Sequence, residues 1–330
     1  MQPKFYQNLG PFPLKEIAKL INSNLQNFEE NVTVNDFTSV EKASFDDLTF
    51  LNDRYNFNVN LIKAKSLIIS NKSSFNFKDR KNLLIVRDVH YAVALVSNLF
   101  FKDLDKNYIN SLNKPNFLHA PNYISNSAVI KNGSIFGSNV TIESGVFVGH
   151  SCIIGNNVTI KNNSIISNSI IGDDVCIGSN CSIGQPGFGF AIDKIKNQKI
   201  FHKGKVVLQN KVNIGANCCI DRGSFSDTII GENSYFDNLC HVAHNVEVGC
   251  NCIFAGQTGI AGSTKIGDFV ISGGQVGIGE HVTIGDRVQI AAKSGVISDV
   301  NSGETIMGHP AINKFKYLKN YISKYGSKNK

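Results

Sequence analysis

The chain has 330 residues, of which 42% are hydrophobic and 18% charged, and its formal net charge is +7 at pH 7. This composition excludes an intrinsically disordered chain and is typical of a globular protein. The first ten residues lack the apolar core of a secretory signal, and the apolar stretch Tyr91–Phe101 is too short to span a bilayer. No nucleic-acid motif is present, and the positive charge either favours acidic partners or reflects a generally basic surface. We expect a cytoplasmic protein without a transmembrane segment, and the sequence leaves peripheral contact with a membrane surface open.

The first part of the chain, residues 1–117, predicts a compact α/β domain. Apolar residues at helical spacing predict helices over Leu14–Ile21 and Tyr91–Phe101. Between them, three short apolar runs separated by polar turns predict strands: Asp46–Leu51, Ser66–Ile69 and Asn82–Val86.

Between residues 118 and 308, an anchor residue recurs at six-residue intervals, with a one-residue slip between Ile166 and Ile171 and longer offsets after Ile183 and Ile220. An α-helix with about 3.6 residues per turn cannot use that period, whereas a solenoid of short strands and tight turns can. Each hexapeptide then forms one flat side, three sides complete a coil, and coils stack about 4.8 Å apart. Glycine follows many anchors, as in Ile214-Gly215, and we expect it to supply unusual backbone angles at the corners. Most anchors are aliphatic: Ile124, Ile130, Phe136, Ile142, Val148, Ile154, Ile160, Ile166, Ile171, Ile177, Ile183, Leu208, Ile214, Ile220, Ile230, Phe236, Val242, Val248, Phe254, Ile260, Ile266, Ser272, Ile278, Ile284, Ile290 and Val296.

The eight cysteines contain no CxxC pair, and no signal peptide supports a disulfide framework. Five of them lie at the fourth position after an anchor, where the interior of a corner needs a small apolar group. We predict that these five are buried free thiols: Cys152, Cys181, Cys218, Cys240 and Cys252.

Two segments interrupt the hexapeptide period. Gln185–Val207 contains Gly187-Phe188-Gly189-Phe190 and is predicted to loop out of the solenoid, and Arg222–Thr228 is a shorter insertion. Insertions in repeat proteins map to loops on a binding face, so both are functional candidates. The period ends near Gly308, and the tail, residues 309–330, is rich in Lys and Tyr and is predicted to be helical.

Taken together, these features resemble a known family. The motifs are Gly187–Phe190, Ile220-Asp221-Arg222-Gly223, Phe236-Asp237-Asn238 and Val242-Ala243-His244-Asn245-Val246. They resemble those of UDP-3-O-acylglucosamine N-acyltransferases (LpxD), as does the order of α/β domain, hexapeptide solenoid and helical tail. The resemblance implies a mainly β fold, a left-handed parallel β-helix, although parallel crossovers are generally right-handed.

The resemblance also implies a reaction and its partners. A fatty acyl group, expected to be 3-hydroxylated, would pass from acyl carrier protein to the 2-amino group of a UDP-3-O-acyl-glucosamine lipid in lipid A biosynthesis. The family forms homotrimers with active sites between neighbouring solenoids. It uses no metal and no cofactor of its own, since phosphopantetheine arrives on the carrier protein.

Family motifs place a general base at His244, and histidine suits that role near neutral pH. His281 follows two full coils and one further position later in the sequence. We therefore expect it about 10 Å away on nearly the same face, contacting substrate or phosphopantetheine. Gly262 matches the position whose backbone N–H faces the oxyanion. Asp237 is a candidate to orient His244 or to cap a turn, and Asn238 a candidate to contact sugar or phosphate.

In the family, uracil stacks between aromatic side chains of the N-terminal domain, and an asparagine reads the base edge. Phe50, Asn52 and Tyr55 resemble that motif, although one residue fewer separates the Phe from the Tyr. We expect residues 1–117 to bind uridine.

Three other functions remain open. UDP-N-acetylglucosamine O-acyltransferases share a similar histidine element, but they usually begin with hexapeptides and follow the histidine with Asp, where this chain has Asn245. A non-catalytic hexapeptide scaffold would not need the motif around His244. A zinc hydratase would use His241, His244 and His281 as ligands, although the first two are expected to point in different directions.

Overall fold

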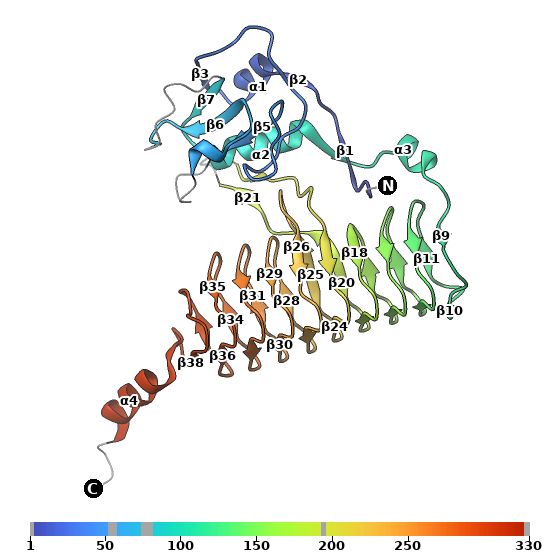
Figure 1. Cartoon of the computed structure of the whole chain (residues 1–330), viewed down its shortest axis with the longest axis vertical. Coiled ribbons are helices and arrows are strands. Elements are labelled where there is room, and N and C mark those ends of the chain that lie inside the picture. Colours follow the sequence, from blue (N-terminus) through green and yellow to red (C-terminus); the bar gives the residue numbers. More distant parts are fainter. Residues whose placement is uncertain (1–2, 52–57, 74–81, 193–195, 327–330) are drawn as a thin grey trace. The chain divides into compact units, whose positions relative to one another are not determined.

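The computed structural model describes residues 3–51, 58–73, 82–192 and 196–326. The chain forms two compact units (Figure 1). The solenoid unit comprises Met1–Phe5, Asp105–Phe188 and Gly204–Lys330, and the N-terminal unit comprises Tyr6–Leu104 and Gly189–Lys203. Among the described residues, none of the helices has both the length and the apolar character needed to cross a membrane.

The solenoid unit is built mostly from two-residue strands that pair in parallel with the matching strand of the next coil, as Thr141 pairs with Thr159. Three sheets result, one for each side of the coil. The first contains β10 (Tyr123–Ile124), β13 (Thr141–Ile142), β16 (Thr159–Ile160), β19 (Cys176–Ile177), β24 (Asn213–Ile214), β27 (Tyr235–Phe236), β30 (Ile253–Phe254), β33 (Ile271–Ser272), β36 (Gln289–Ile290), β38 (Thr305–Met307) and β39 (Ile312–Asn313). The second contains β11 (Val129–Ile130), β14 (Phe147–Val148), β17 (Ile165–Ile166), β20 (Ser182–Pro186), β25 (Cys219–Arg222), β28 (His241–Val242), β31 (Gly259–Ile260), β34 (Gly277–Ile278) and β37 (Gly295–Val296). The third contains β9 (Asn116–Phe117), β12 (Ile135–Phe136), β15 (Ile153–Ile154), β18 (Ser169–Ile171), β23 (Val206–Leu208), β26 (Thr228–Ile230), β29 (Glu247–Val248), β32 (Lys265–Ile266) and β35 (Thr283–Ile284).

The predicted anchors form the core of this unit. Every anchor from Phe136 to Val296 is buried, including the polar Ser272, whereas Ile124 and Ile130 in the first coil are half-buried. The stacked rings of Phe236 and Phe254 lie 4.7 Å apart, centroid to centroid. The hexapeptide period therefore predicts the direction of each anchor side chain correctly.

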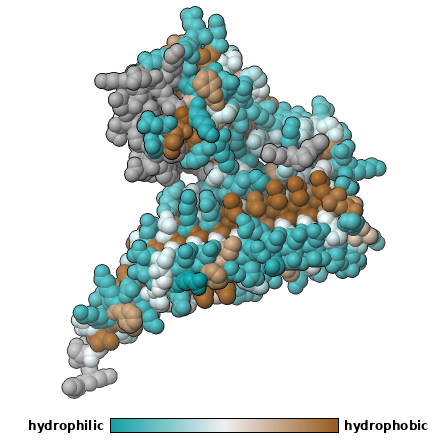
Figure 2. Space-filling model, viewed as in Figure 1, coloured by the Kyte–Doolittle hydropathy of each residue, from teal (hydrophilic) through white to brown (hydrophobic). Residues whose placement is uncertain are grey.

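The residue before each anchor faces outward. In the third sheet these residues form a half-buried aliphatic column of Ile135, Ile153, Ile170, Val207 and Ile229. Figure 2 shows a hydrophobic band along the solenoid. In the same sheet the column turns polar at Glu247 and Lys265.

The expected role of the anchor-following glycines is wrong. Gly215 and Gly231 do not have a positive φ; the left-handed conformation falls at the third position after the anchor, often on asparagine, as at Asn217 and Asn233. Asparagine tolerates that conformation better than most residues. A Cβ on Gly215 would lie 2.7 Å from the backbone N of Asn238 in the next coil. Glycine is needed there because two coil backbones approach closely.

The prediction for the cysteines is confirmed. Cys152, Cys181, Cys218, Cys240 and Cys252 are at most 3% exposed, and all are free thiols. The solenoid unit also contains α3 (Lys106–Ser111) before the first coil and α4 (Lys314–Tyr325) after the last, so the predicted helix in the tail is present over Lys314–Tyr325.

The N-terminal unit contains a four-stranded sheet in the order β3-β7-β6-β5. Its strands are β3 (Asn24–Gln26), β5 (Leu48–Phe50), β6 (Ser66–Ser70) and β7 (Leu83–Val86), and its helices are α1 (Leu14–Leu20) and α2 (Val89–Phe100). Smaller elements are β1 (Tyr6–Asn8), β2 (Phe12–Pro13), β4 (Thr33–Val34), β8 (Phe101–Asp103) and a 3-10 turn over Val59–Leu61. The helices and strands predicted from apolar spacing are present, with ends shifted by one or two positions.

The longer insertion does not simply loop out of the solenoid, because residues 189–203 fold within the N-terminal unit. They form a hairpin of β21 (Phe190–Ala191) and β22 (Gln198–Lys199). Asn98 Nδ2 on α2 donates a hydrogen bond to the carbonyl oxygen of Lys199 at 2.6 Å. The hexapeptide pattern could not reveal this docking, because it depends on backbone acceptors contacting a helix that is distant in the sequence.

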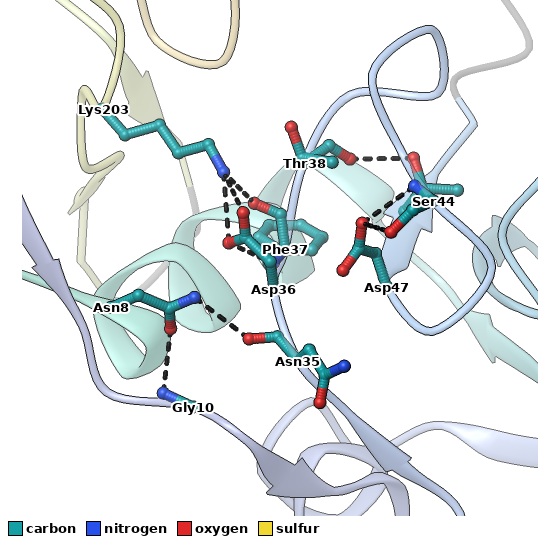
Figure 3. A network of polar contacts seen from close by, with 10 residues as sticks. Asn8, Gly10, Asn35, Asp36, Phe37, Thr38, Ser44, Asp47 and Lys203 are labelled. Atoms are coloured by element: carbon teal, nitrogen blue, oxygen red, sulfur yellow. Dashed lines mark hydrogen bonds and ion pairs between the residues drawn. The ribbon is translucent and has the colours of Figure 1, made fainter. Parts of the chain in front are cut away.

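Lys203, at the end of this insertion, is fixed inside the N-terminal unit (Figure 3). Its ammonium group donates to the Asp36 carboxylate at 3.0 Å and to the carbonyl oxygen of Phe37 at 2.8 Å. It also lies 4.5 Å from the centre of the Phe101 ring. Burial lowers the pKa of Lys203, and the Asp36 charge opposes that shift.

Candidate active site

His244 lies at the corner between β28 and β29, in a slot lined by two glycines. A Cβ on Gly187 would stand 2.6 Å from Cβ and 2.8 Å from Cδ2 of His244. A Cβ on Gly262 would stand 2.8 Å from Cε1 and 3.0 Å from Nε2 of the same ring. Such distances are far inside van der Waals contact. Both positions therefore need glycine for the imidazole to occupy this place.

The side chain of Asn245 determines which ring nitrogen of His244 carries a proton. His244 Nδ1 lies 2.9 Å from Asn245 Oδ1. The orientation of this amide is fixed, because the backbone N–H of Ser224 donates to Oδ1 at 3.1 Å and Nδ2 donates to the carbonyl oxygen of Ser226 at 3.3 Å. Nδ1 must therefore be the donor, which leaves Nε2 of the neutral ring as an acceptor next to Gly262.

Gly262 and His281 continue upward from His244. Ser263 N donates to the carbonyl oxygen of His244 at 2.9 Å, and His281 N donates to that of Gly262 at 3.1 Å. The N–H of Gly262 takes no part in these hydrogen bonds between successive coils. The exposed His281 has φ +59°, like Ser263 at +61° and Asn245 at +62°. Asn245, Ser263 and His281 therefore occupy the same position in three successive coils. His244 and Gly262 occupy the position just before it, so His281 stands two coils above Asn245 and not directly above His244.

Asp237 and Asn238 lie at a different corner of the coil, after β27. Asp237 Oδ1 accepts from Asn238 N at 2.7 Å, and Oδ2 accepts from Gly256 N at 3.1 Å. Asn238 Oδ1 accepts from Ala216 N at 2.8 Å. In this structure both side chains cap turns, and Asn245 contacts the His244 ring.

Asp221 is a carboxylate beside the site that sequence reasoning did not assign. It follows Ile220, the register partner of Val242, and its side chain is 14% exposed. Its Oδ2 lies 3.9 Å from His241 Nε2. Burial raises the pKa of Asp221, and the neighbouring His241, His244 and Arg222 side chains oppose that shift. Its place in the Ile220–Gly223 motif, in register just before His244, was the signal that could have found it.

The residues predicted to bind uridine belong to the N-terminal unit. Phe50 ends β5, is half-buried, and has its ring centre 5.4 Å from that of Phe37. Asn52 and Tyr55 lie outside the described residues. Within the described ranges, no cluster of three or more His, Cys, Asp or Glu side chains has the arrangement of a metal site.

Comparison with known proteins gives partial matches. The family model for the GMPPB C-terminal domain matches residues 112–223. A UDP-3-O-acylglucosamine N-acyltransferase of Caulobacter vibrioides (strain NA1000 / CB15N) is 51% identical over 76 residues, 23% of this chain and 22% of the relative. A UDP-3-O-acylglucosamine N-acyltransferase 2 of Legionella pneumophila (strain Lens) is 50% identical over 130 residues, 39% of this chain and 38% of the relative. The matched stretches thus span only about a fifth to two fifths of these relatives.

The fold of the chain is similar to that of a solved structure. The UDP-N-acetylglucosamine acyltransferase from Campylobacter jejuni is 30% identical, covers 58% of this chain and 73% of its own, and has a TM-score of 0.52. This similarity confirms that the β-helix is left-handed. In sequence the chain is similar over part of its length to UDP-3-O-acylglucosamine N-acyltransferases, and in fold it is similar to a UDP-N-acetylglucosamine acyltransferase, on a left-handed hexapeptide β-helix.

Proposed function

We propose that this chain transfers a fatty acyl group, 3-hydroxylated as in the family, from an acyl carrier protein thioester to the 2-amino group of a UDP-3-O-acyl-glucosamine lipid. The observation that carries the proposal is His244, held between Gly187 and Gly262 with Nε2 as an acceptor. The named relatives support the choice of acceptor and bond. The reaction would take place in the cytoplasm, as a step of lipid A biosynthesis.

The geometry supports a single-base mechanism. Nε2 of His244 takes a proton from the amine as its nitrogen attacks the thioester carbonyl carbon. The resulting oxyanion would face the N–H of Gly262, which the coil ladder leaves unused. Collapse of the intermediate forms the amide and breaks the C–S bond. The imidazolium then returns its proton to the phosphopantetheine sulfur, so protons and electrons balance.

Other groups would bind and orient the substrates. We assign His281 to the phosphopantetheine or acyl side of the site, because it is exposed two coils above Asn245. Asp237 and Asn238, at an exposed corner, are candidates for the sugar or phosphate. We assign uridine to the N-terminal unit through Phe50, Asn52 and Tyr55, which follows the family resemblance.

The proposed partners follow from charge and from apolar surface. Acyl carrier protein is acidic, and the net charge of +7 favours such a donor. The outward column of Ile135, Ile153, Ile170, Val207 and Ile229 supports packing against a second copy in a homotrimer. Neither proposal requires a metal ion or a cofactor of the chain's own.

The test is transfer of an acyl group from acyl carrier protein by the wild type and by His244→Ala. Loss of the base is expected to lower kcat by roughly 10²–10⁴-fold. His150→Ala is the matched control, because His150 also lies at the second position after an anchor of the second sheet but on an earlier coil. Full activity in His244→Ala, with His150→Ala equally active, would end the base assignment.

One observation favours a second candidate. The Campylobacter jejuni structure is a UDP-N-acetylglucosamine acyltransferase. Offering the enzyme a labelled acyl group on acyl carrier protein, with UDP-N-acetylglucosamine and the 2-amino substrate in parallel, separates the two reactions, because alkaline hydroxylamine releases the newly transferred label from an ester but not from an amide. An ester as the preferred product would replace the N-acyl proposal with the O-acyl one.

A further inference from the structure

The insertion Arg222–Thr228 lengthens the coil that lies directly below His244. In that coil Val207 of β23 pairs with Ile229 of β26. In the next coil Ile229 pairs with Glu247, which is the spacing of an uninterrupted coil such as the one from Thr141 to Thr159. The lower coil is therefore the longer of the two, and its extra residues lie beside the proposed base.

This insertion is held firmly by its own contacts. Phe225 is 6% exposed. Lys205 Nζ lies 2.7 Å from Asp227 Oδ2, and the Lys205 N–H donates to Asp227 Oδ1 at 3.2 Å. The Gly204 N–H donates to the carbonyl oxygen of Gly223 at 3.0 Å. The polar groups of the insertion that face the next coil are therefore fixed in place.

Those groups contact the side-chain oxygen, the side-chain nitrogen and the backbone N–H of Asn245. Its Oδ1 accepts from the Ser224 hydroxyl at 3.0 Å as well as from the Ser224 N–H. Its Nδ2 lies 2.5 Å from the Ser226 hydroxyl and also donates to the Ser226 carbonyl. Its backbone N–H donates to Thr228 Oγ1 at 2.9 Å. The insertion thus determines the position of a side chain that contacts His244 Nδ1.

We propose that the insertion is a positioning element for the general base. It holds Asn245 so that neutral His244 carries its proton on Nδ1 and keeps Nε2 as the acceptor facing Gly262. Ser224, Ser226 and Asn245 are positioning residues, because they act on the reacting amine only through His244. The inference rests on the proposed function of His244, but the tautomer can be measured without any activity.

The neutral amide has a chemical consequence. A carboxylate at position 245 would favour the imidazolium form and reduce the fraction of free base. Within the described part of the chain, Asp221 lies 3.9 Å from His241 Nε2 and already interacts with His244. An amide at position 245 orients the ring without adding a second negative charge to it.

The first experiment reads the tautomer by nitrogen-15 NMR of the imidazoles, with His244→Gln used to assign the signal. Asn245→Gly removes the side chain but keeps the positive φ. Asn251→Gly is the matched control: it has φ +58°, and its Oδ1 accepts from Asn233 at 2.8 Å on another corner. We expect protonated Nδ1 in the wild type and in Asn251→Gly, and loss of that preference in Asn245→Gly.

The second experiment measures kinetics. Asn245→Gly is expected to lower kcat by roughly 10-fold or more, within the 10²–10⁴-fold lost with the base itself, and to change KM little. Asn245→Asp should move the acidic limb of the kcat/KM profile to higher pH by roughly one unit or more. Ser224→Ala combined with Ser226→Ala should loosen the amide and give a smaller fall in kcat, without the pH shift.

The outcomes separate the two ideas. An unchanged tautomer in Asn245→Gly, or a wild-type ring protonated on Nε2, overturns the positioning inference whatever the activity. An Asn245→Gly fall in kcat that Asn251→Gly matches overturns it as well. A protonated Nδ1 together with a fully active His244→Ala would uphold the positioning contact and reject the proposed base.

Discussion

Replacing Gly262 by alanine tests the slot that holds the imidazole. The new methyl group would stand 2.8 Å from Cε1, 3.0 Å from Nε2 and 3.2 Å from Nδ1 of His244. Carbon atoms settle at about 3.5–4.0 Å, so the ring would have to retreat by roughly 0.7 Å or more. Gly187 stands against the opposite Cβ–Cδ2 edge, and Asn245 holds Nδ1. The ring therefore cannot move without losing one of these contacts.

A displacement of about 1 Å at a reacting group costs roughly 100-fold in rate, so Gly262→Ala should lower kcat by about 10- to 100-fold. Gly262 does not have a positive φ and keeps its N–H as alanine, so neither backbone strain nor a lost oxyanion donor would explain the fall. Overpacking should also reduce the free energy of unfolding by about 1–3 kcal/mol.

The assay is the acyl transfer rate, with urea unfolding measured in parallel. Gly259→Ala is the control, because a Cβ there would meet nothing within 4 Å. We expect the control to keep the wild-type rate and stability. If Gly262→Ala turns over like the wild type, the ring is not confined as described. A Gly259→Ala variant that loses as much activity would show that any added methyl group on this face is harmful.

Three further predictions concern charge and burial. Burial raises the pKa of Asp221 above its ordinary value of 3.8, so the wild-type protein loses stability as the pH rises from 3.8 through the raised pKa. Asp221→Asn has no carboxyl group to ionise and lacks this loss. The Tm of Asp221→Asn minus that of the wild type should therefore grow between pH 4 and pH 7. Equal Tm values across that range would contradict the burial argument. Cys152 is buried, and burial raises its pKa to about 12, so maleimide should not label it until denaturant is added. Cys219 is exposed and should be labelled in the native protein. Mass spectrometry of peptides would measure both. The Lys203 side chain is 8% exposed, and Lys203→Ala should cost about 3 kcal/mol in urea unfolding by leaving the Asp36 carboxylate without its cation, although the Phe37 N–H still donates to it; a loss well below about 1 kcal/mol would mean that water replaces the ammonium group.

The sequence by itself determined the repeating part of the molecule. The hexapeptide period predicted which side chains are buried, down to Ser272 and the five corner cysteines. It succeeded because the inward or outward direction of a side chain in a solenoid depends only on its place within its own hexapeptide. The short strands and helices of the N-terminal unit were readable for a similar reason, since each depends on local apolar spacing.

The tertiary structure alone decided what surrounds His244. Gly187 and Gly262 approach its ring from distant positions on either side of it in the sequence, and Ser224 and Ser226 fix its neighbour Asn245. The contacts with Gly187, Ser224 and Ser226 depend on how far each insertion lengthens its coil, which no local pattern encodes, whereas Gly262 follows His244 by one uninterrupted coil. The docking of residues 189–203 in the N-terminal unit and the close approach at Gly215 have the same origin. A period fixes the direction of a side chain, but only the folded chain fixes what that side chain meets.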